Sequence, residues 1–256
     1  MDTHHPSRRH VLRGLAACPS LAVVLADPGL ARAAAAALQE VSIPVGGGTA
    51  RAALALPEAK TAPAVLLIHE WWGLNDQMRA VTAELAKEGF VALAVDLYGG
   101  RVAATPEEAE TLRKGVDPAT ATETLVSWVR WLRQRPEVAG GVATCGWCFG
   151  GGWSLETSIA TPVEATIIYY GRVDQPGERL AKLRGPVLGH FATRDSFIDK
   201  KMVQGFEALM ALAGKPLTVY WYEADHAFAN PTGGRYDAAD AALAWERSLA
   251  FLRAHT

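Results

Sequence analysis

From about residue 38 onward, the chain alternates short runs of β-branched or apolar residues with longer amphipathic stretches. This alternation is typical of a mainly parallel β-sheet wrapped by helices, an α/β architecture. The short runs predict strands at residues 51–56, 64–68, 91–95, 142–145, 165–169, 187–191 and 217–222. The amphipathic stretches predict helices near residues 77–87, 119–133, 150–160, 200–213 and 238–253. We therefore expect a single α/β domain over residues 38–256, with helices on both faces of the sheet.

Two segments refine this picture. Residues 64–68 (AVLLI) form a continuous apolar run, and such a strand belongs at the centre of a sheet that is covered on both faces. Residues 101–118 are charged and poorly periodic, so we expect a surface loop or a short helix there, near the mouth of a site. The chain shows no internal repeat or low-complexity linker after residue 37.

The first 37 residues differ in composition from the rest and resemble an export signal. Paired arginines, Arg8 and Arg9, precede a modestly apolar stretch at residues 15–26, and residues 31–33 (ARA) offer an Ala-x-Ala cleavage position. That order is typical of a twin-arginine signal, which directs a folded bacterial protein to the periplasm. We therefore expect the twin-arginine export machinery as a partner, removal of the leader and a periplasmic location.

Two other interpretations of the leader remain open. It could be an alanine-rich helix that leads directly into the domain, or residues 15–18 (LAAC) could be a lipobox with Cys18 as the lipid acceptor. The lipobox is disfavoured because few apolar residues separate Arg13 from Cys18 and the apolar run continues beyond the cysteine. No other segment approaches the roughly 20 consecutive apolar residues of a membrane span. The mature protein is therefore expected to be soluble, with no stable membrane span.

Composition and charge exclude one class of partner and direct attention to the cysteines. The formal net charge is −2, and the 25 basic and 27 acidic residues are mixed along the chain. Nucleic acid is not expected as a partner, because its phosphates select a basic stripe or patch. Three cysteines are too few for a disulfide framework, and two of them, Cys145 and Cys148, lie three residues apart in the body of the chain.

Residues 142–152 (VATCGWCFGGG) combine an apolar run, a glycine-flanked turn and the start of a predicted helix. This order matches the G-x-nucleophile-x-G elbow of hydrolases, with Cys148 at the position more often held by serine. The flanking glycines are needed because side chains in so tight a turn would collide with neighbouring backbone. The elbow places the sulfur at the start of a helix, whose unpaired N–H groups favour a thiolate. The alternative is a glycine-rich packing site around an inert, buried cysteine.

Cys145 and Cys148 also form a C-x-x-C pair, which is typical of thioredoxin-like redox sites. In such a site the first cysteine lies at the amino end of a helix. Here Cys145 is expected to end a strand, and the helix is expected to start only after Cys148. The spacing therefore favours a nucleophile over a redox pair, and both thiols are expected to stay reduced because their side chains should diverge.

An acid and a histidine follow the elbow in the chain order that α/β-hydrolases use. Asp195 lies in a loop after the apolar run 187–191, and His226 follows the run 217–222. Asp225 competes with Asp195 as the acid that orients the histidine, but its side chain would have to fold back on its own loop. We therefore assign Cys148, Asp195 and His226 as a candidate catalytic triad.

Residues 69–75 (HEWWGLN) directly follow the apolar run 64–68. In an α/β-hydrolase the loop after this strand supplies one backbone N–H of the oxyanion hole, and the residue after the nucleophile supplies the other. This assigns the N–H groups of Trp71 and Phe149. Glu70 adds an acid beside the thiol, although a solvated turn would also account for residues 69 and 70.

Four separated segments together resemble the dienelactone hydrolase (carboxymethylenebutenolidase) family of the α/β-hydrolase superfamily. They are the HEWWG turn, residues 96–98 (DLY), the GWCFGG elbow, and the loops that carry Asp195 and residues 224–228 (ADHAF). The resemblance runs from about residue 41 to the carboxyl end. It implies an α/β-hydrolase fold and a hydrolase of enol-lactones or related activated esters with neither metal nor organic cofactor. It also implies that Glu70 pairs with the resting thiol and moves toward an arginine when an anionic substrate arrives and Cys148 ionises.

The chain departs from the family pattern where the substrate would bind. Asn230 stands four residues after His226, where the family prototype carries an arginine for the substrate carboxylate. Arg101 and Arg113 are the candidates for a second such arginine, from the loop after the DLY segment. These departures leave the chemistry intact and leave the substrate open.

These residues together predict two-step acyl transfer through an acyl-cysteine, with His226 moving protons between Cys148, the leaving group and water. The rival is a periplasmic binding or thiol-redox protein on the same fold, because a fold alone does not establish a function. The candidates for contact with a small ester or lactone substrate are Trp72, Tyr98, Arg101, Arg113, Tyr169 and Asn230. Aromatic side chains at positions 71, 72, 147, 169 and 170 are expected either to line an apolar pocket or to pack in the core.

Overall fold

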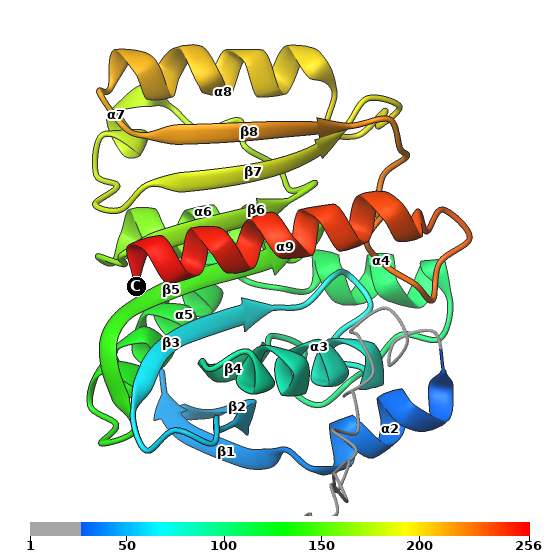
Figure 1. Cartoon of the computed structure of the whole chain (residues 1–256), viewed down its shortest axis with the longest axis vertical. Helices are drawn as coiled ribbons and strands as arrows, with labels where there is room; N and C mark the ends of the chain where they lie inside the picture. Colours follow the sequence, from blue (N-terminus) through cyan, green and yellow to red (C-terminus); the bar gives the residue numbers. More distant parts are fainter. Residues whose placement is uncertain (1–26) are drawn as a thin grey trace, which may run out of the picture.

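The computed structural model describes residues 27–256, and its centre is an eight-stranded sheet with helices on both faces (Figure 1). The strands are β1 (Gln39–Val45), β2 (Gly48–Ala55), β3 (Ala62–Ile68), β4 (Val91–Asp96), β5 (Val138–Trp147), β6 (Ala165–Tyr169), β7 (Val187–Ala192) and β8 (Leu217–Tyr222). The helices are α2 (Pro28–Ala36), α3 (Asp76–Lys87), α4 (Pro106–Lys114), α5 (Pro118–Arg133), α6 (Phe149–Ala160), α7 (Gly177–Leu180), α8 (Lys200–Leu212) and α9 (Ala238–His255).

The strand order is β1-β2-β4-β3-β5-β6-β7-β8, and most of the sheet is parallel. The pairings β1–β2 and β2–β4 are antiparallel, whereas the five pairings from β4 to β8 are parallel. Parallel strands need crossover connections, and the intervening helices provide them. This architecture confirms the predicted mainly parallel α/β sheet.

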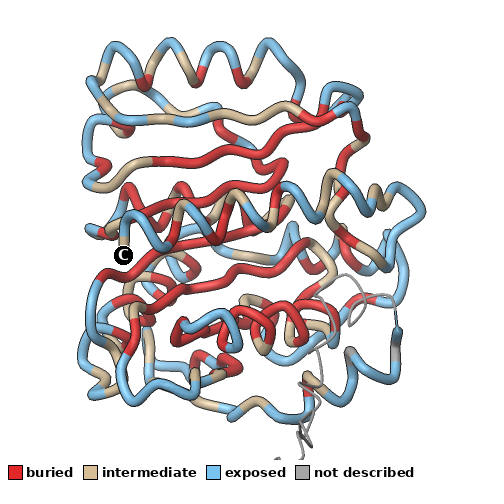
Figure 2. Tube along the Cα trace, viewed as in Figure 1, coloured by how far each residue is buried: buried red, intermediate tan, exposed pale blue. Residues whose placement is uncertain are grey.

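Two layers of helices bury the sheet. On one face, α3 and α9 pack on the central strands through side chains such as Met78, Leu85 and Leu249. On the other face, α5 covers the strands near β3, and α6 and α8 cover those near β6 and β7. The tube in Figure 2 is accordingly red along the central strands, and six of the seven residues 62–68 are buried. The apolar run at 64–68 therefore lies at the sheet centre, as predicted.

The observed elements differ from the expected ones mainly at the amino-terminal side. Strand β1 was not expected, and α4 is the short helix within the charged segment 101–118. Residues 1–26 of the expected export signal lie outside the described residues. Its remaining part contains α2, which includes the Ala31–Ala33 cleavage position and reaches α3 through an ion pair of Arg32 Nε with Asp76 Oδ2 at 3.8 Å.

The parallel strands end at a common edge of the sheet. Ile68 of β3 lies opposite Gly146 of β5, and Trp147 lies opposite Tyr169 of β6. Farther along, Ala192 of β7 lies opposite Tyr222 of β8. The loops that leave these strands therefore meet at one edge, which is where ligands bind in parallel α/β sheets.

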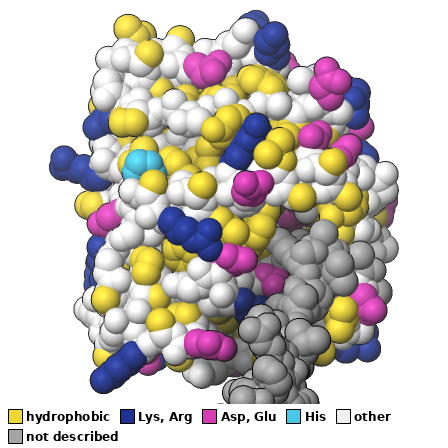
Figure 3. Space-filling model, viewed as in Figure 1, with side chains coloured by type: hydrophobic (Ala, Val, Ile, Leu, Met, Phe, Trp, Pro, Cys, Tyr) yellow, Lys and Arg dark blue, Asp and Glu magenta, His cyan; other side chains and the backbone are white. Residues whose placement is uncertain are grey.

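The surface carries both signs of charge. On the face seen in Figure 3, basic and acidic side chains are interspersed, and no basic stripe crosses the described part of that face. Within residues 27–256, no helix combines the length and the apolar character that a membrane crossing requires.

Candidate active site

The turn after β5 has the geometry of a nucleophile elbow. Cys148 has φ 52° and ψ −115°, a conformation that is strained for a residue with a side chain. A Cβ atom on Gly146 would lie 2.0 Å from the carbonyl oxygen of Gly150, and one on Gly150 would lie 2.1 Å from that of Ile68. Glycine is therefore required at both positions, and the tight turn presents the sulfur at the carboxyl edge of the sheet.

Cys148, His226 and Asp195 form a continuous line of hydrogen bonds. His226 Nε2 lies 3.2 Å from Cys148 Sγ, and His226 Nδ1 lies 2.6 Å from Asp195 Oδ2. The other oxygen of Asp195 accepts hydrogen bonds from the backbone N–H groups of Phe197 at 2.8 Å and Ile198 at 3.0 Å. The carboxylate is thereby held on its own loop and aimed at the imidazole.

The competing acid, Asp225, does not contact His226. Its carboxylate pairs at 3.4 Å with the guanidinium of Arg194, and both side chains are about half exposed. The geometry therefore favours Asp195, as the sequence predicted, because only Asp195 reaches the histidine.

The environment of Cys148 favours the protonated thiol at rest. Burial raises its pKa to about 12 together with the negative charges of Glu70 and Asp195, whereas the backbone N–H groups of Phe149 and Trp71 lower it. The N–H group of Phe149 at the helix start favours the thiolate as expected, but burial and two acids outweigh the two amides in the resting site. Deprotonation requires His226, which is already in hydrogen-bonding contact with the sulfur.

The same two amides are those assigned to the oxyanion hole. Trp71 follows β3 and Phe149 opens α6, so their N–H groups come from two separate loops at the sheet edge. Both N–H groups lower the pKa of Cys148, so both lie close to its sulfur. An oxygen on a carbon bonded to that sulfur would lie within their reach, which is the arrangement that stabilises a tetrahedral oxyanion.

Asp195 is ionised at neutral pH, whereas the thiol of Cys148, which it supports through His226, is protonated at rest. Burial alone would raise the pKa of Asp195, but the hydrogen bonds from His226 and from the amides of Ile198 and Phe197 lower it below its usual value. The group is therefore an anion at neutral pH and can stabilise a protonated imidazole.

Comparison with known proteins shows which family this chain resembles. The model of the dienelactone hydrolase family matches residues 50–256. The chain belongs to the dienelactone hydrolase family. It is 29% identical over 221 residues to the carboxymethylenebutenolidase of Pseudomonas putida, and the aligned region covers 80% of this chain and 92% of that protein. It is 30% identical over 228 residues to the carboxymethylenebutenolidase of Pseudomonas sp. strain P51, with 81% and 91% covered.

Solved structures support the fold. The dienelactone hydrolase-like promiscuous phosphotriesterase P91 from metagenomic libraries has a TM-score of 0.78 at 23% identity, with 85% of this chain and 98% of that chain covered. The chain therefore has the α/β-hydrolase fold of dienelactone hydrolase structures.

Glu70 in this family member is buried and held by neutral groups. Its Oε1 accepts a hydrogen bond from the hydroxyl of Tyr170 at 3.0 Å, and its Oε2 accepts one from Asn230 Nδ2 at 2.5 Å. Burial raises the pKa of Glu70, and these two hydrogen bonds act in the opposite direction. The resemblance implied that Glu70 pairs with the resting thiol, but both of its oxygens contact Tyr170 and Asn230 instead, and the thiol contacts His226.

Asn230 is a fixed part of this arrangement. Its Oδ1 accepts hydrogen bonds from Thr232, at 3.0 Å from the backbone N–H and at 2.7 Å from the hydroxyl. Because the oxygen is occupied in this way, the amide nitrogen faces Glu70. The side chain expected to contact substrate therefore acts first as a partner of Glu70.

His69 fixes the start of the same loop. It is fully buried, its Nδ1 lies 2.5 Å from the carbonyl oxygen of Glu70, and its Nε2 accepts the backbone N–H of Leu97 at 3.2 Å. With Nε2 as acceptor, the proton is on Nδ1 and is donated to that carbonyl. Burial lowers the pKa of His69, so the ring stays neutral and ties the loop after β3 to the loop after β4.

An aromatic cluster covers the oxyanion side of the site. Tyr98, which follows β4, and Leu112 of α4 pack with the partly buried Trp71, Trp72 and Phe149. The hydroxyl of Tyr98 is buried without a hydrogen-bond partner among the described residues. Burial and the charge of an ionised Cys148 raise the pKa of Tyr98, so this hydroxyl remains protonated and able to donate. Tyr98 and Trp72 thus stay candidates for substrate contact.

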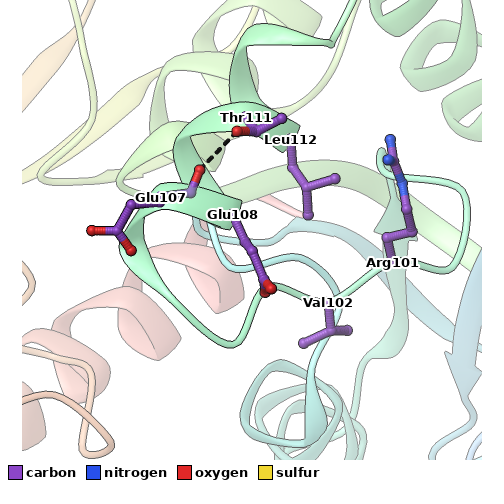
Figure 4. Close-up of a pocket in the computed structure, with 6 residues that line it drawn as sticks. All are labelled: Arg101, Val102, Glu107, Glu108, Thr111 and Leu112. Atoms are coloured by element: carbon purple, nitrogen blue, oxygen red, sulfur yellow. Dashed lines mark hydrogen bonds between the residues drawn. The ribbon is translucent and has the colours of Figure 1, made fainter.

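The two candidate arginines lie at the surface. Arg113 is bound at its Nε and Nη2 by the two oxygens of Glu110, each at 2.8 Å. Arg101 is exposed, and with Val102 and α4 it lines a cavity of about 460 Å³ (Figure 4). Arg101 is the one basic side chain among the six residues that line this cavity, so the cavity holds no converging basic groups.

Tyr169 belongs to the core and not to the substrate site. It is 1% exposed, its ring stacks on Trp147 at 5.1 Å, and its hydroxyl bonds Ser248 of α9 at 2.7 Å. Its backbone carbonyl accepts the N–H of Cys148 at 2.9 Å, so it supports the elbow from below. The assignment of Tyr169 to substrate binding is therefore corrected.

Cys145 also lies in the core. It is within β5, opposite Leu67 and Ile167, and burial raises the pKa of its thiol well above the usual value. Cys145 and Cys148 are both free. A redox pair would place its first cysteine at a helix start, whereas here only Cys148 precedes a helix.

Two site residues were not identified from the sequence. Phe197 is 66% exposed, and its ring meets that of His226 edge-on at 5.3 Å. Tyr170, which the sequence placed only among possible pocket aromatics, bonds Glu70 and packs edge-on against His226 at 5.2 Å. A position just after a strand was the available signal for Tyr170, while for Phe197 no signal separated it from an ordinary loop residue.

Backbone strain is concentrated at this edge. Among residues 27–256, the non-glycine residues with positive φ are Cys148 at 52°, Tyr170 at 36° and Ala227 at 67°. All three are at, or next to, a side chain that contacts the sulfur or Glu70. Across that same range, no three His, Cys, Asp or Glu side chains are grouped as metal ligands.

Proposed function

We propose that this family member hydrolyses activated carboxylic esters, enol-lactones among them, through an acyl-cysteine formed on Cys148. The observation that carries the proposal is the line of hydrogen bonds from Cys148 through His226 to Asp195, at a strained elbow whose sulfur faces two backbone amides. Nucleophile, base and orienting acid within hydrogen-bonding distance are the hallmark of covalent acyl transfer.

The first half of the reaction forms the thioester. His226 Nε2 takes the proton of Cys148 as the sulfur attacks the carbonyl carbon, and the N–H groups of Trp71 and Phe149 receive the oxyanion. When the tetrahedral carbon collapses, the carbon–oxygen bond to the leaving group breaks, and the protonated His226 supplies its proton to the leaving oxygen. Asp195 keeps the imidazole in the required tautomer through both steps.

The second half releases the acid. Water attacks the thioester carbonyl while His226 takes its proton, and collapse of the second tetrahedral carbon returns the electron pair to sulfur, which takes the proton back from His226. A thiolate leaves a tetrahedral carbon more readily than an alkoxide does, so the first half favours substrates with good leaving groups such as enolates. Ordinary alkyl esters and amides are therefore expected to be poor substrates.

The test is a burst assay with p-nitrophenyl acetate on the full chain. We expect Cys148→Ala to lower kcat/KM by about 10⁴-fold or more, since triad members act as a unit. Acid quenching during turnover should yield one acetyl group on the peptide that carries Cys148. Cys145→Ala is the matched control, because it removes a neighbouring thiol that does not reach the site, and it should retain activity within a few fold. Full activity in Cys148→Ala, or equal loss in Cys145→Ala, would reject the proposal and, in the second case, favour redox chemistry.

We also propose that the chain is exported to the periplasm through the twin-arginine machinery. The support is the order of residues in the leader, with Arg8 and Arg9 ahead of an apolar stretch and an Ala-x-Ala position at 31–33. Protein recovered from a native periplasm should begin between residues 33 and 39 by mass spectrometry. Lysine at both positions 8 and 9 should retain the precursor in the cytoplasm, while lysine in place of Arg13 serves as a control of equal charge. Exported protein that retains Met1, or a lipid on Cys18, would contradict this proposal.

A further inference from the structure

The buried charges around the reacting sulfur are predominantly negative. The ionisable side chains that face Cys148 from the loops after β3, β7 and β8 are Glu70, Asp195 and His226, each no more than 9% exposed. When Cys148 passes its proton to His226, the charges of those two groups cancel and the carboxylate of Asp195 remains. The buried groups are therefore net negative in the reacting state, whether Glu70 is ionised or not.

No buried cation balances this charge. Among residues 27–256, every lysine and arginine is at least partly exposed. The two groups that hold Glu70 are the neutral amide of Asn230 and the hydroxyl of Tyr170. Thr232 occupies the amide oxygen, so Asn230 presents its N–H to Glu70 and cannot turn.

The cations at the rim are poor substitutes. Arg113 is already paired with Glu110 through two hydrogen bonds, and Arg101 is exposed to solvent. The charge of Arg235 lowers the pKa of Glu70, but its side chain is also exposed. Exposed charges are screened by water and salt, whereas charges inside the site act through a lower dielectric. An anionic group on the substrate would therefore lose its hydration and gain no buried partner, which is unfavourable.

Aromatic side chains contact the residues of the site. The exposed ring of Phe197 lies against His226, and Trp71 and Trp72 pack edge-on at 5.1 Å in the cluster that also contains Tyr98 and Phe149. Such walls favour an uncharged organic group over a carboxylate. Charge and shape thus point to the same class of substrate.

We propose that this site selects esters and lactones that carry no negative charge near the reacting carbonyl. The inference rests on the proposed esterase function and specifies its substrate class. Glu70, Asn230 and Tyr170 form the wall that disfavours anions, and Asn230 is the position where a single cation would reverse the preference.

The test compares two enol-lactones that differ in one charge. These are 4-carboxymethylenebut-2-en-4-olide and its methyl ester, which share the ring and the scissile bond. Each kcat/KM is divided by the rate constant for hydroxide hydrolysis of the same lactone, which corrects for intrinsic reactivity. We expect the corrected value for the methyl ester to exceed that for the acid by about tenfold or more, since like charges in a partly desolvated site repel strongly.

A pair of variants then tests whether position 230 is responsible for the effect of charge on substrate preference. Asn230→Lys puts an ammonium group beside Glu70 and should lower the ratio of methyl ester to acid by about tenfold or more. Gly234→Lys puts the same charge on the same loop at an exposed position where a Cβ meets nothing within 4 Å, and it should leave the ratio within about twofold. Circular dichroism melting shows whether each variant is folded. The comparison of the two lactones on the wild type tests the inference even if a variant does not fold.

The outcomes separate this inference from the function on which it rests. Hydrolysis of both lactones by the wild type with equal corrected rates, or faster hydrolysis of the acid, would overturn the inference and leave the esterase function standing. A preference for the acid that disappears in Arg235→Gln would assign anion recognition to the rim and would also overturn it. If the wild type hydrolyses neither lactone nor p-nitrophenyl acetate, the proposed function fails and this inference fails with it.

Discussion

Two of the three buried histidines in residues 27–256 whose ring nitrogens are both occupied, His226 and His190, serve different ends. His226 lies between Asp195 Oδ2 at 2.6 Å and Cys148 Sγ at 3.2 Å. His190 of β7 lies between the hydroxyls of Tyr222 at 2.8 Å and Ser248 at 2.9 Å. One histidine thus links an acid to a thiol, and the other links two strands of the sheet to α9.

The partners decide what each ring can do. Burial and, to a smaller extent, the charge of Arg247 lower the pKa of His190 to about 3, and no acid is in contact to oppose them. That ring therefore stays neutral and serves packing and orientation. His226 has an anion on one side and a proton donor on the other, so a proton can enter and leave it. Burial and hydrogen bonding are common to both sites, and the difference is the acid, which the loop after β7 supplies only to His226.

The largest expected effect comes from removing that acid. Asp195→Asn should lower kcat by about 10⁴-fold, because the amide no longer stabilises the imidazolium and can hold the wrong tautomer. Hydrolysis of p-nitrophenyl acetate measures it. Asp225→Asn is the matched control, since Asp225 precedes the histidine in sequence but pairs with Arg194. If the control loses as much activity as Asp195→Asn, Asp195 is not the orienting acid.

The next effect should appear in stability and not in catalysis. His190→Ala removes one of the two hydrogen-bond partners of each hydroxyl, because Tyr222 keeps Arg247 and Ser248 keeps Tyr169, and it empties a fully buried site. We expect a loss of about 2–4 kcal/mol in the free energy of unfolding. Urea titration at pH 7.5 measures it, with His255→Ala on the exposed end of α9 as control. Well below the melting temperature, kcat should stay within a few fold of wild type. A loss of activity like that of Asp195→Asn would show that the two histidines do not differ in role.

The same substitution tests the pH dependence. Because the folded-state pKa of His190 is about 3, the unfolded chain binds a proton near pH 6.5 that the folded chain does not. This contribution lowers stability as pH falls from about 6.5 to about 3 and is absent above that window. His190→Ala should therefore show a flatter fall in unfolding free energy across those values, and parallel curves for the two proteins would contradict the buried neutral ring.

The smallest effect concerns Glu70, the acid that does not touch a histidine. Its negative charge is, after burial, the main cause that raises the pKa of Cys148. Glu70→Gln should therefore shift the midpoint of iodoacetamide alkylation at Cys148 to lower pH, by about one unit. Glu223→Gln removes an exposed carboxylate nearby and should leave the midpoint unchanged. An unshifted midpoint in Glu70→Gln would show that its charge does not reach the sulfur.

The triad was predictable because its members follow local rules. Cys148, Asp195 and His226 each come within four residues of the end of a strand, and parallel strands bring such positions to one edge. The partners of Glu70 were not predictable in this way. Tyr170 and Asn230 are 100 and 160 residues away from it, and their side chains meet it only through the particular conformations of three loops.

The fold shows the same division between local and distant causes. The central strands were predicted because they are continuously apolar, and β6 and β8 have the expected bounds. Strand β1 was missed because it is an edge strand whose residues are exposed or half-buried, and because it contains Pro44, which argues against a strand. Its place is decided by pairing with β2, which no short window of sequence reveals.

The strain at Cys148, Tyr170 and Ala227 bears on how this protein would respond to selection for heat resistance. Each of these residues has positive φ, which costs free energy in the native state and persists only because the surrounding packing imposes it. Substitutions that relax this backbone strain would raise thermal stability and lower catalytic activity at the same time. Directed evolution that screens for thermostability alone should therefore collect its gains at these three loops, and a screen that keeps turnover as a second criterion should avoid them.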